Sequence, residues 1–270
     1  MHSVNRQSLS CPQTAGKLKS SKQHLAVNVV TAFNTWAFKR EQPSNLQLLN
    51  AVVERLVERR HPLEFVLYWG KGPRAVVGGP ELECLDYIVA FRSRIAAIYS
   101  PGANIRLICT DTHAVLNGHS RSVIASYFHS VGEAASQRGF EWCLLGDLTR
   151  NQVDNIGHIC PADRAARTIA QLERSAMRWY KGGSKPIDGA IAYYDMNMRE
   201  KRAVELEFPN AVFITFSGSE LRELFPAAMP IFYMYSVRKG ISVKPWFIDD
   251  AQVGQAAVAL AAAVAPAHAL

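Results

Sequence analysis

The stretch Val66–Ile88, VLYWGKGPRAVVGGPELECLDYI, joins an apolar run to a glycine-rich loop and then to a helical pattern. The apolar run EFVLYW, which ends at Trp69, has the length and composition of a buried strand. Pro80 stands in the first turn of the following pattern with acidic residues beside it, which favours a helix start. The stretch therefore predicts a strand, a polar loop and a helix in succession.

The same alternation continues on both sides of this stretch. Two helical patterns fill 23–60, and the second carries an apolar stripe at Leu46, Leu49, Val52, Val53 and Leu56. Further strands are predicted within 100–111, 141–148, 211–217, 231–237 and 240–247, and helices over 122–138, 161–181 and 188–206. Strands that alternate with long helices indicate a Rossmann-like α/β fold, with a mainly parallel sheet, helices on both faces and a small C-terminal β/helical portion.

The composition of the sequence indicates how the chain is divided into segments and which classes of molecule it binds. We expect a disordered segment over 1–22, a Rossmann-like catalytic domain over 23–255 and an Ala-rich helix or tail over 256–270. The net charge of +7 suits an anionic small molecule or a nucleic acid. Five cysteines without metal-ligand spacing indicate free thiols, and no apolar segment reaches the length of a membrane span, so we expect a cytoplasmic protein without a membrane partner.

The loop after Trp69 is the first candidate site. Its GKGPRA sequence matches G-x-G-x-x-A, but the helix begins only near Pro80, so a dinucleotide fingerprint is not indicated. A P-loop is not indicated either, because no Ser or Thr follows Lys71. Lys71 and Arg74, together with free backbone N–H groups, could instead hold a phosphate or carboxylate. The alternative is a solvated surface turn.

The segment TDTHAVLNGHSRS follows the second predicted strand and is the second candidate site. It contains Asp111, His113, His119 and Arg121. An Asp and a His at a strand end can carry out acid–base chemistry near neutral pH. The alternatives are that Asp111 caps a turn and that the histidines lie exposed in a loop. No third metal ligand has a defined spacing, so neither a metal nor a cofactor is expected.

A third set of polar residues lies on the helix predicted over 188–206. Tyr194, Asn197 and Lys201 share one face at spacings of three and four, and Glu200 lies within a turn of them. We expect Tyr194, Asn197 and Lys201 to face the pocket of Lys71, and Glu200 to orient a neighbouring cation. The cations of the loop would lower the pKa of Lys201, which could then act as a base. An equally good alternative is a solvated helix face.

The order of these elements resembles the isocyanide synthase family of pyoverdine and dityrosine biosynthesis over roughly 45–250. The stretch VVGGPELECLDYI is similar to V-L-G-x-L-P-D of the family, and IAAIYSPGANIRLICTD to I-x-x-I-Y-x-P-G-A-x-V-x-I-x-S-D. KPW, which contains Lys244 and Trp246, resembles T-P-W-H. The resemblance implies a Rossmann-like fold and a reaction in which an α-amino acid amine condenses with ribulose 5-phosphate and becomes an isocyanide. Lys71 and Asp111 are the positions that carry over directly.

The chain departs from the family pattern at several polar positions. Thr112 stands where the family has Gly, and Phe247 where it has His. Pro230 and Met234 stand where the family has an Arg and a His. Two other functions are therefore kept open: a cyclodipeptide-synthase-like enzyme that uses aminoacyl-tRNA, and a non-catalytic ligand-binding relative.

Overall fold

The computed structural model describes residues 13–70, 73, 76–156, 165–180 and 185–235, and they contain a five-stranded sheet in which all strands are parallel. The spatial order is β3-β2-β1-β4-β5. The strands are β1 (Leu63–Trp69), β2 (Ala103–Cys109), β3 (Glu141–Leu144), β4 (Val212–Thr215) and β5 (Ile231–Tyr233). This arrangement confirms the predicted α/β class with a Rossmann-like parallel sheet.

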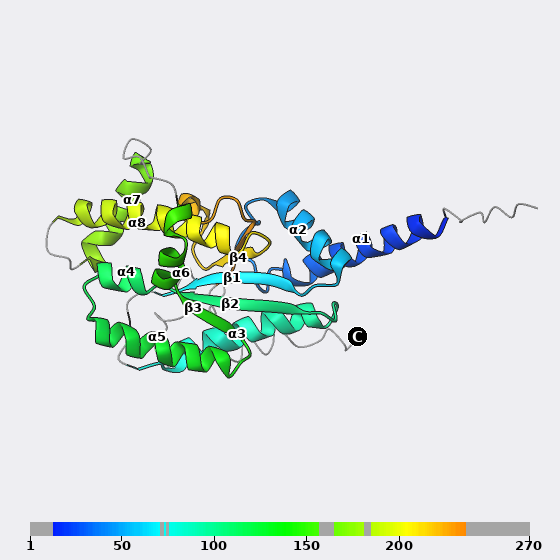
Figure 1. The fold of residues 1–270 in the computed structure, drawn as a ribbon, viewed down its shortest axis with the longest axis horizontal. Helices are drawn as coiled ribbons and strands as arrows, with labels where there is room; N and C mark the ends of the chain where they lie inside the picture. The colour runs from blue at the N-terminus through cyan, green and yellow to red at the C-terminus, as the bar shows by residue number, and fades with distance from the viewer. Residues whose placement is uncertain (1–12, 71–72, 74–75, 157–164, 181–184, 236–270) are drawn as a thin grey trace, which may run out of the picture.

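Two helical layers enclose the sheet, as Figure 1 shows, with α3 and α5 below the strands and α6 and α8 above them. The helices on or near the first layer are α1 (Gln13–Phe33), α2 (Leu46–Arg59), α3 (Gly79–Ala96) and α5 (Arg121–Ser136). The second layer and its connections contain α4 (Asp111–Leu116), α6 (Leu145–Asn151), η1 (Val153–Asn155), α7 (Ala166–Trp179), α8 (Pro186–Glu207) and η3 (Ser219–Leu224). Each layer buries its own hydrophobic cluster against one face of the sheet.

Local signals explain where several helices begin. Pro80 lies in the first turn of α3, and the Glu81 carboxylate accepts a hydrogen bond from the Gly78 backbone N–H at 3.1 Å. Asn45 caps α2 by accepting a hydrogen bond from Leu48 N. Of the apolar stripe predicted for α2, all members are buried except Leu46, which is 44% exposed because it lies in the first turn, at the edge of the packed face.

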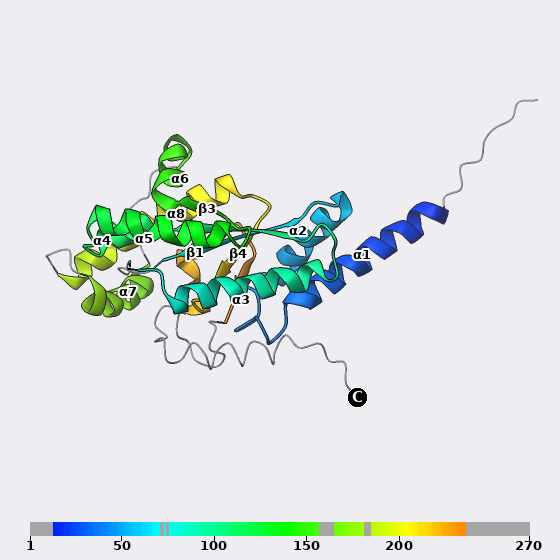
Figure 2. The same ribbon diagram turned by 90° about the horizontal axis from the view of Figure 1, so that it is seen from below.

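One predicted boundary was wrong, that of the strand over 141–148, while the extent of the N-terminal segment 1–22 stays a prediction. Helix α1 begins at Gln13, within that segment, and its N-terminal half extends away from the body in Figures 1 and 2. Its C-terminal half packs through buried residues such as Phe33, and helix propagation from a packed end adds one hydrogen bond per residue. The strand predicted over 141–148 ends at Leu144, where α6 begins. The expected strand over 240–247 and the tail over 256–270 lie outside the described residues.

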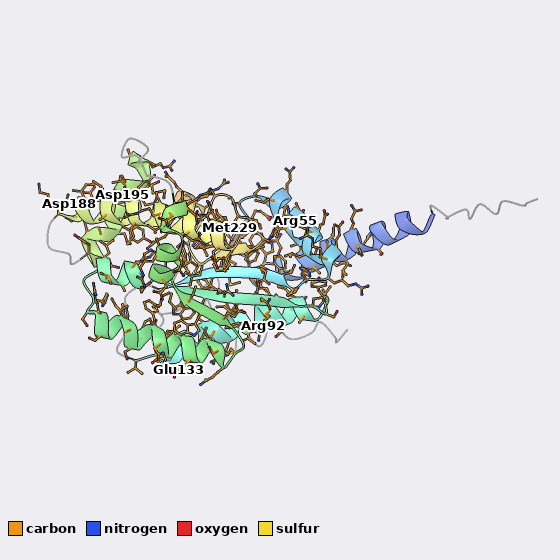
Figure 3. All side chains as sticks on the ribbon, viewed as in Figure 1. Arg55, Arg92, Glu133, Asp188, Asp195 and Met229 are labelled. Atoms are coloured by element: carbon orange, nitrogen blue, oxygen red, sulfur yellow. The ribbon has the colours of Figure 1, made fainter. Side chains whose placement is uncertain are left out.

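The strand order places a topological switch point at the centre of the sheet. From β1 the chain moves outward to β2 and β3, and it then returns to the other side of β1 to form β4 and β5. Ligands of open α/β sheets bind beyond the carboxyl ends of the strands at such a point. The carboxyl ends of β1 and β4 are therefore the place to look for a functional site. Charged side chains such as Glu133 of α5, by contrast, lie on the outer surface (Figure 3).

Candidate functional site

The face of the sheet beneath α8 changes from apolar to hydroxyl-bearing at its carboxyl edge. The apolar positions that pack into the core on this face are Val66, Ile108, Phe213 and Ile231. The positions two residues further along β1, β4 and β5, which point to the same face, are Tyr68, Thr215 and Tyr233, and Thr110 directly follows the end of β2. A row of hydroxyl groups thus crosses three strands at the switch point, with the Thr110 hydroxyl just beyond the end of the fourth.

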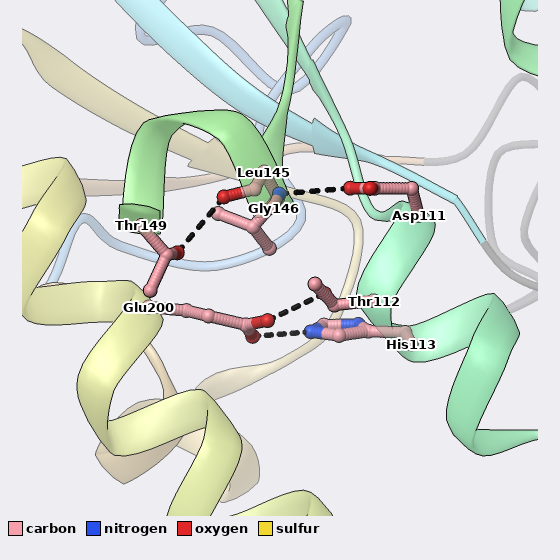
Figure 4. Close-up of polar contacts among 7 residues, drawn as sticks. All are labelled: Asp111, Thr112, His113, Leu145, Gly146, Thr149 and Glu200. Carbon is pink, nitrogen blue, oxygen red and sulfur yellow. Dashed lines mark hydrogen bonds and ion pairs between the residues drawn. The ribbon is translucent and has the colours of Figure 1, made fainter. Parts of the chain in front are cut away.

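Helix α4 follows β2 directly and brings two side chains of the second candidate segment to α8 (Figure 4). The Nε2 atom of His113 lies 2.7 Å from Oε2 of Glu200, and the Thr112 hydroxyl donates a hydrogen bond to Glu200 Oε1. The side chains of His113 and Glu200 are only 10% and 1% exposed. An imidazole that donates to Glu200 from Nε2 and carries a single proton has its lone pair on Nδ1.

Two tyrosine rings flank the imidazole of His113. The ring centroid of Tyr68 lies 6.2 Å away at 80°, and that of Tyr193 lies 4.8 Å away at 62°. Burial, and next the charge of Glu200, raise the pKa of both phenols above the ordinary tyrosine value. Both tyrosines are therefore uncharged hydrogen-bond donors at neutral pH, next to a histidine that a buried carboxylate orients.

Several polar atoms around this centre lack hydrogen-bond partners within the described residues. They are the Tyr68 hydroxyl, the Thr110 hydroxyl and Oδ1 of Asn197. Buried polar atoms are paired in most proteins, and unpaired ones often mark a place where a ligand or water binds. Their presence at the switch point adds to the case that this edge of the sheet binds a polar molecule.

Asp111 joins the end of β2 to the start of α6. Its Oδ1 accepts a hydrogen bond from the Gly146 backbone N–H at 2.9 Å (Figure 4). This contact corresponds to the capping alternative considered for Asp111, while a role in catalysis stays a prediction. Gly70, at the end of β1, has φ of +154°, and a Cβ there would lie 2.0 Å from the Thr110 hydroxyl, so the close approach of the two strand ends requires glycine.

The polar residues of α8 divide between two faces. Tyr193, Asn197 and Glu200, at spacings i, i+4 and i+7, share the face that carries the contact with His113. Tyr194 instead donates a hydrogen bond to Glu223 Oε1 at 2.8 Å, and Lys201 Nζ donates to the Glu223 backbone carbonyl at 2.7 Å.

The side chains of Tyr194 and Lys201 thus belong to a network around Glu223 on η3, and that they face the pocket of Lys71, which lies outside the described residues, stays a prediction. Thr168 of α7 donates to the same carboxylate. Burial lowers the pKa of Lys201, and the charges of Glu205 and Glu223 partly oppose this effect.

The remaining predicted residues are not brought to His113 by the described contacts. His119 is half-buried in the turn between α4 and α5, and Arg121 is exposed at the start of α5. Lys71, Arg74, Lys244 and Trp246 lie outside the described residues.

Two of the positions where the family has polar groups lie in the interior of this chain. Met234 is fully buried in the hydrophobic cluster on the α3 side of the sheet, and Pro230 is buried at the start of β5. Neither position offers a polar side chain to the site. Thr112, which replaces a glycine of the family pattern, provides the hydroxyl that holds Glu200.

Sequence reasoning missed Tyr68, Tyr193 and Thr112. Tyr193 shares the i, i+4, i+7 spacing with Asn197 and Glu200, so this signal was present but the adjacent face was chosen. Tyr68 is the last residue of β1 on the α8 face, and its alternation with Val66 could have identified it.

No group of three or more His, Cys, Asp or Glu side chains that could hold a metal ion occurs in the described part of the chain. None of the helices in the described ranges has both the length and the apolarity that a membrane crossing requires.

Comparison with known proteins yields structural likeness alone. No family model matches the chain, and no curated protein matches it. The chain is similar to the crystal structure of the PvcA protein from Pseudomonas aeruginosa, with a TM-score of 0.61 and 16% identity over 82% of this chain and 87% of that one. It is also similar to tyrosyl-tRNA synthetase from Archaeoglobus fulgidus, with a TM-score of 0.45 and 12% identity over 82% of this chain and 65% of that one. The likeness to PvcA shows a shared α/β fold.

Proposed function

We propose that the chain is a biosynthetic enzyme that performs acid–base chemistry on an α-amino acid at the carboxyl edge of its sheet. The observation that carries the proposal is the buried His113–Glu200 pair at the switch point. A histidine held in one tautomer by a buried carboxylate is suited to accept a proton, because its second nitrogen keeps a directed lone pair. When an uncharged amine attacks a carbonyl carbon, its nitrogen becomes cationic and has to lose a proton, which is the task that His113 Nδ1 would perform.

The more specific proposal is an isocyanide-synthase-like reaction, in which the amine condenses with ribulose 5-phosphate and its nitrogen becomes an isocyanide. Two observations support it: the Y-x-P-G-A…D motif that ends at Asp111, through which the chain resembles the isocyanide synthase family, and the α/β fold shared with PvcA. In this proposal Lys71 and Arg74 bind the sugar phosphate, and the neutral phenols and Asn197 bind uncharged polar groups of the substrates.

The test is turnover by the purified full chain. The protein is incubated with a mixture of amino acids and isotopically labelled ribulose 5-phosphate, and mass spectrometry follows amino acid consumption and labelled isocyanide. We expect one amino acid to be consumed and its product to carry the label. Consumption without label would retain the amino acid enzyme and reject the co-substrate. No consumption, together with salt-sensitive binding of tRNA, would reject the proposal in favour of an aminoacyl-tRNA enzyme.

A matched pair of variants tests the assignment of His113. Removing a general base lowers kcat by about 10²–10⁴-fold, so we expect His113→Asn to lose activity to that extent. His129→Asn is the control, because His129 also pairs with a glutamate, Glu133, but on the exposed outer side of α5. Equal activity of both variants would contradict the role given to His113.

A further inference from the structure

Tyr68 is a residue of the site whose hydroxyl group has no structural task visible in its contacts. It is the last residue of the central strand β1 on the face that α8 covers. Its ring packs edge-on against the rings of Phe213 and His113, with distances of 4.9 Å and 6.2 Å between the ring centroids. Its hydroxyl oxygen is inaccessible to solvent and has no hydrogen-bond partner among the described residues. The ring is thus packed, while the O–H group is left without an acceptor.

Tyr233, on the same face of the sheet, also has a buried hydroxyl without a partner among the described residues, but Tyr99 and Tyr87 show the usual arrangement of a buried phenol. The Tyr99 hydroxyl donates to the backbone carbonyl of His61 at 2.7 Å, and the Tyr87 hydroxyl donates to that of Ala37 at 2.9 Å. A phenol that served only to fill space at position 68 could be a phenylalanine without loss of packing. The unpaired O–H of Tyr68 therefore calls for a partner that is present only when the site is occupied.

The surroundings of Tyr68 determine what kind of partner this is. Burial and the charges of Glu200, Tyr193 and Glu205 raise the pKa of the Tyr68 phenol far above neutral pH. The phenol is thus a donor and not a base, and it lies next to the histidine to which we assign the base role. A neutral donor beside a general base fits an oxygen atom that gains negative charge while the base removes a proton.

We infer that Tyr68 is a further catalytic residue, which donates a hydrogen bond from its hydroxyl to the carbonyl oxygen of the substrate that the amine attacks. This inference rests on the proposed function, since it presupposes an amine and a carbonyl substrate. In the step, the uncharged amine nitrogen forms a bond to the carbonyl carbon, and the π electron pair of the C=O bond moves to the oxygen. His113 Nδ1 takes one proton from the nitrogen, and the resulting alkoxide accepts the Tyr68 hydrogen bond.

The variant Tyr68→Phe in the full chain tests this role through two independent measurements. Because the unpaired hydroxyl is buried without compensation, its removal should raise the melting temperature by about 2–4 °C. Because an oxyanion donor is lost, kcat should fall by about 10²–10³-fold, while KM changes much less. The control is Tyr99→Phe, which removes a hydroxyl that is hydrogen-bonded to the backbone and should lower the melting temperature while kcat is retained.

The outcomes separate this inference from the proposed function. A lower melting temperature of Tyr68→Phe would mean that the hydroxyl has a structural partner and would overturn the inference, whatever the activity. A raised melting temperature with unchanged kcat would also overturn it. If the wild type consumes no amino acid, the proposed function fails, and a raised melting temperature would still support a hydroxyl reserved for a ligand.

Discussion

The buried pair between His113 and Glu200 should be strongly coupled in stability, and a double-mutant cycle can measure this coupling. Glu200 is 1% exposed, and both of its oxygens have donors, from His113 and from Thr112. Removing one partner of a buried pair typically costs about 3–5 kcal/mol, because the other is left without compensation. We therefore expect Glu200→Ala to lower the free energy of unfolding by at least about 3 kcal/mol, or about 6–12 °C in melting temperature.

The cycle consists of the wild type, Glu200→Ala, His113→Ala and the double variant, each unfolded in urea and followed by circular dichroism. The coupling energy should be about 1.5–3 kcal/mol. A second cycle on His129 and Glu133 is the control, since this pair lies 3.4 Å apart with side chains 69% and 62% exposed. Its coupling should be about 0.3–0.5 kcal/mol. Equal coupling in the two cycles would refute the view that burial makes the His113–Glu200 contact strong.

Three further predictions concern other contacts of the fold. Glu223→Ala should lower the free energy of unfolding, measured by urea titration, by about 2–4 kcal/mol, because two hydroxyl groups that donate to this carboxylate lose their acceptor. The control is Glu220→Ala on the same 3₁₀ helix, which should change the free energy of unfolding little because Glu220 is exposed. Gly132→Ala should also lower the urea midpoint, because a Cβ at this position would lie 2.1 Å from the Trp142 ring. Overpacking costs about 1–3 kcal/mol, whereas the higher helix propensity of alanine contributes about 1 kcal/mol. In the Trp142→Leu background, Gly132→Ala should therefore lower the midpoint less. Burial raises the pKa of thiols such as that of Cys84, and of several phenols, above the values of about 8.5 and 10 at which cysteine and tyrosine ionise in the unfolded chain. The folded state therefore binds more protons than the unfolded state at alkaline pH, and the melting temperature should fall as the pH rises through that range. A melting temperature that does not change over this range would contradict the prediction.

The local order of helices and strands follows from the sequence because its signals are local. Pro80 and Glu81 mark the start of α3 within one helical turn, and the apolar stripe of α2 faces the core at every predicted position except Leu46. Alternating strands and helices lead to a parallel sheet, and a parallel sheet puts the end of β2, with Asp111 and His113, at the ligand-binding edge.

The composition of the site depended on the tertiary structure. His113 and Glu200 are 87 positions apart, and their contact depends on how α8 is rotated on the sheet. A helix advances 100° per residue, so the choice between Tyr193 and Tyr194 as the inward residue is decided by packing and not by the local pattern. The strand residue Tyr68 reads as part of an apolar run, and only its position beside His113, with a hydroxyl that lacks an acceptor, distinguishes it. Periodicity fixes which residues share a face, but only the packed structure decides which face meets which neighbour, because that choice depends on side-chain volumes distant in the sequence.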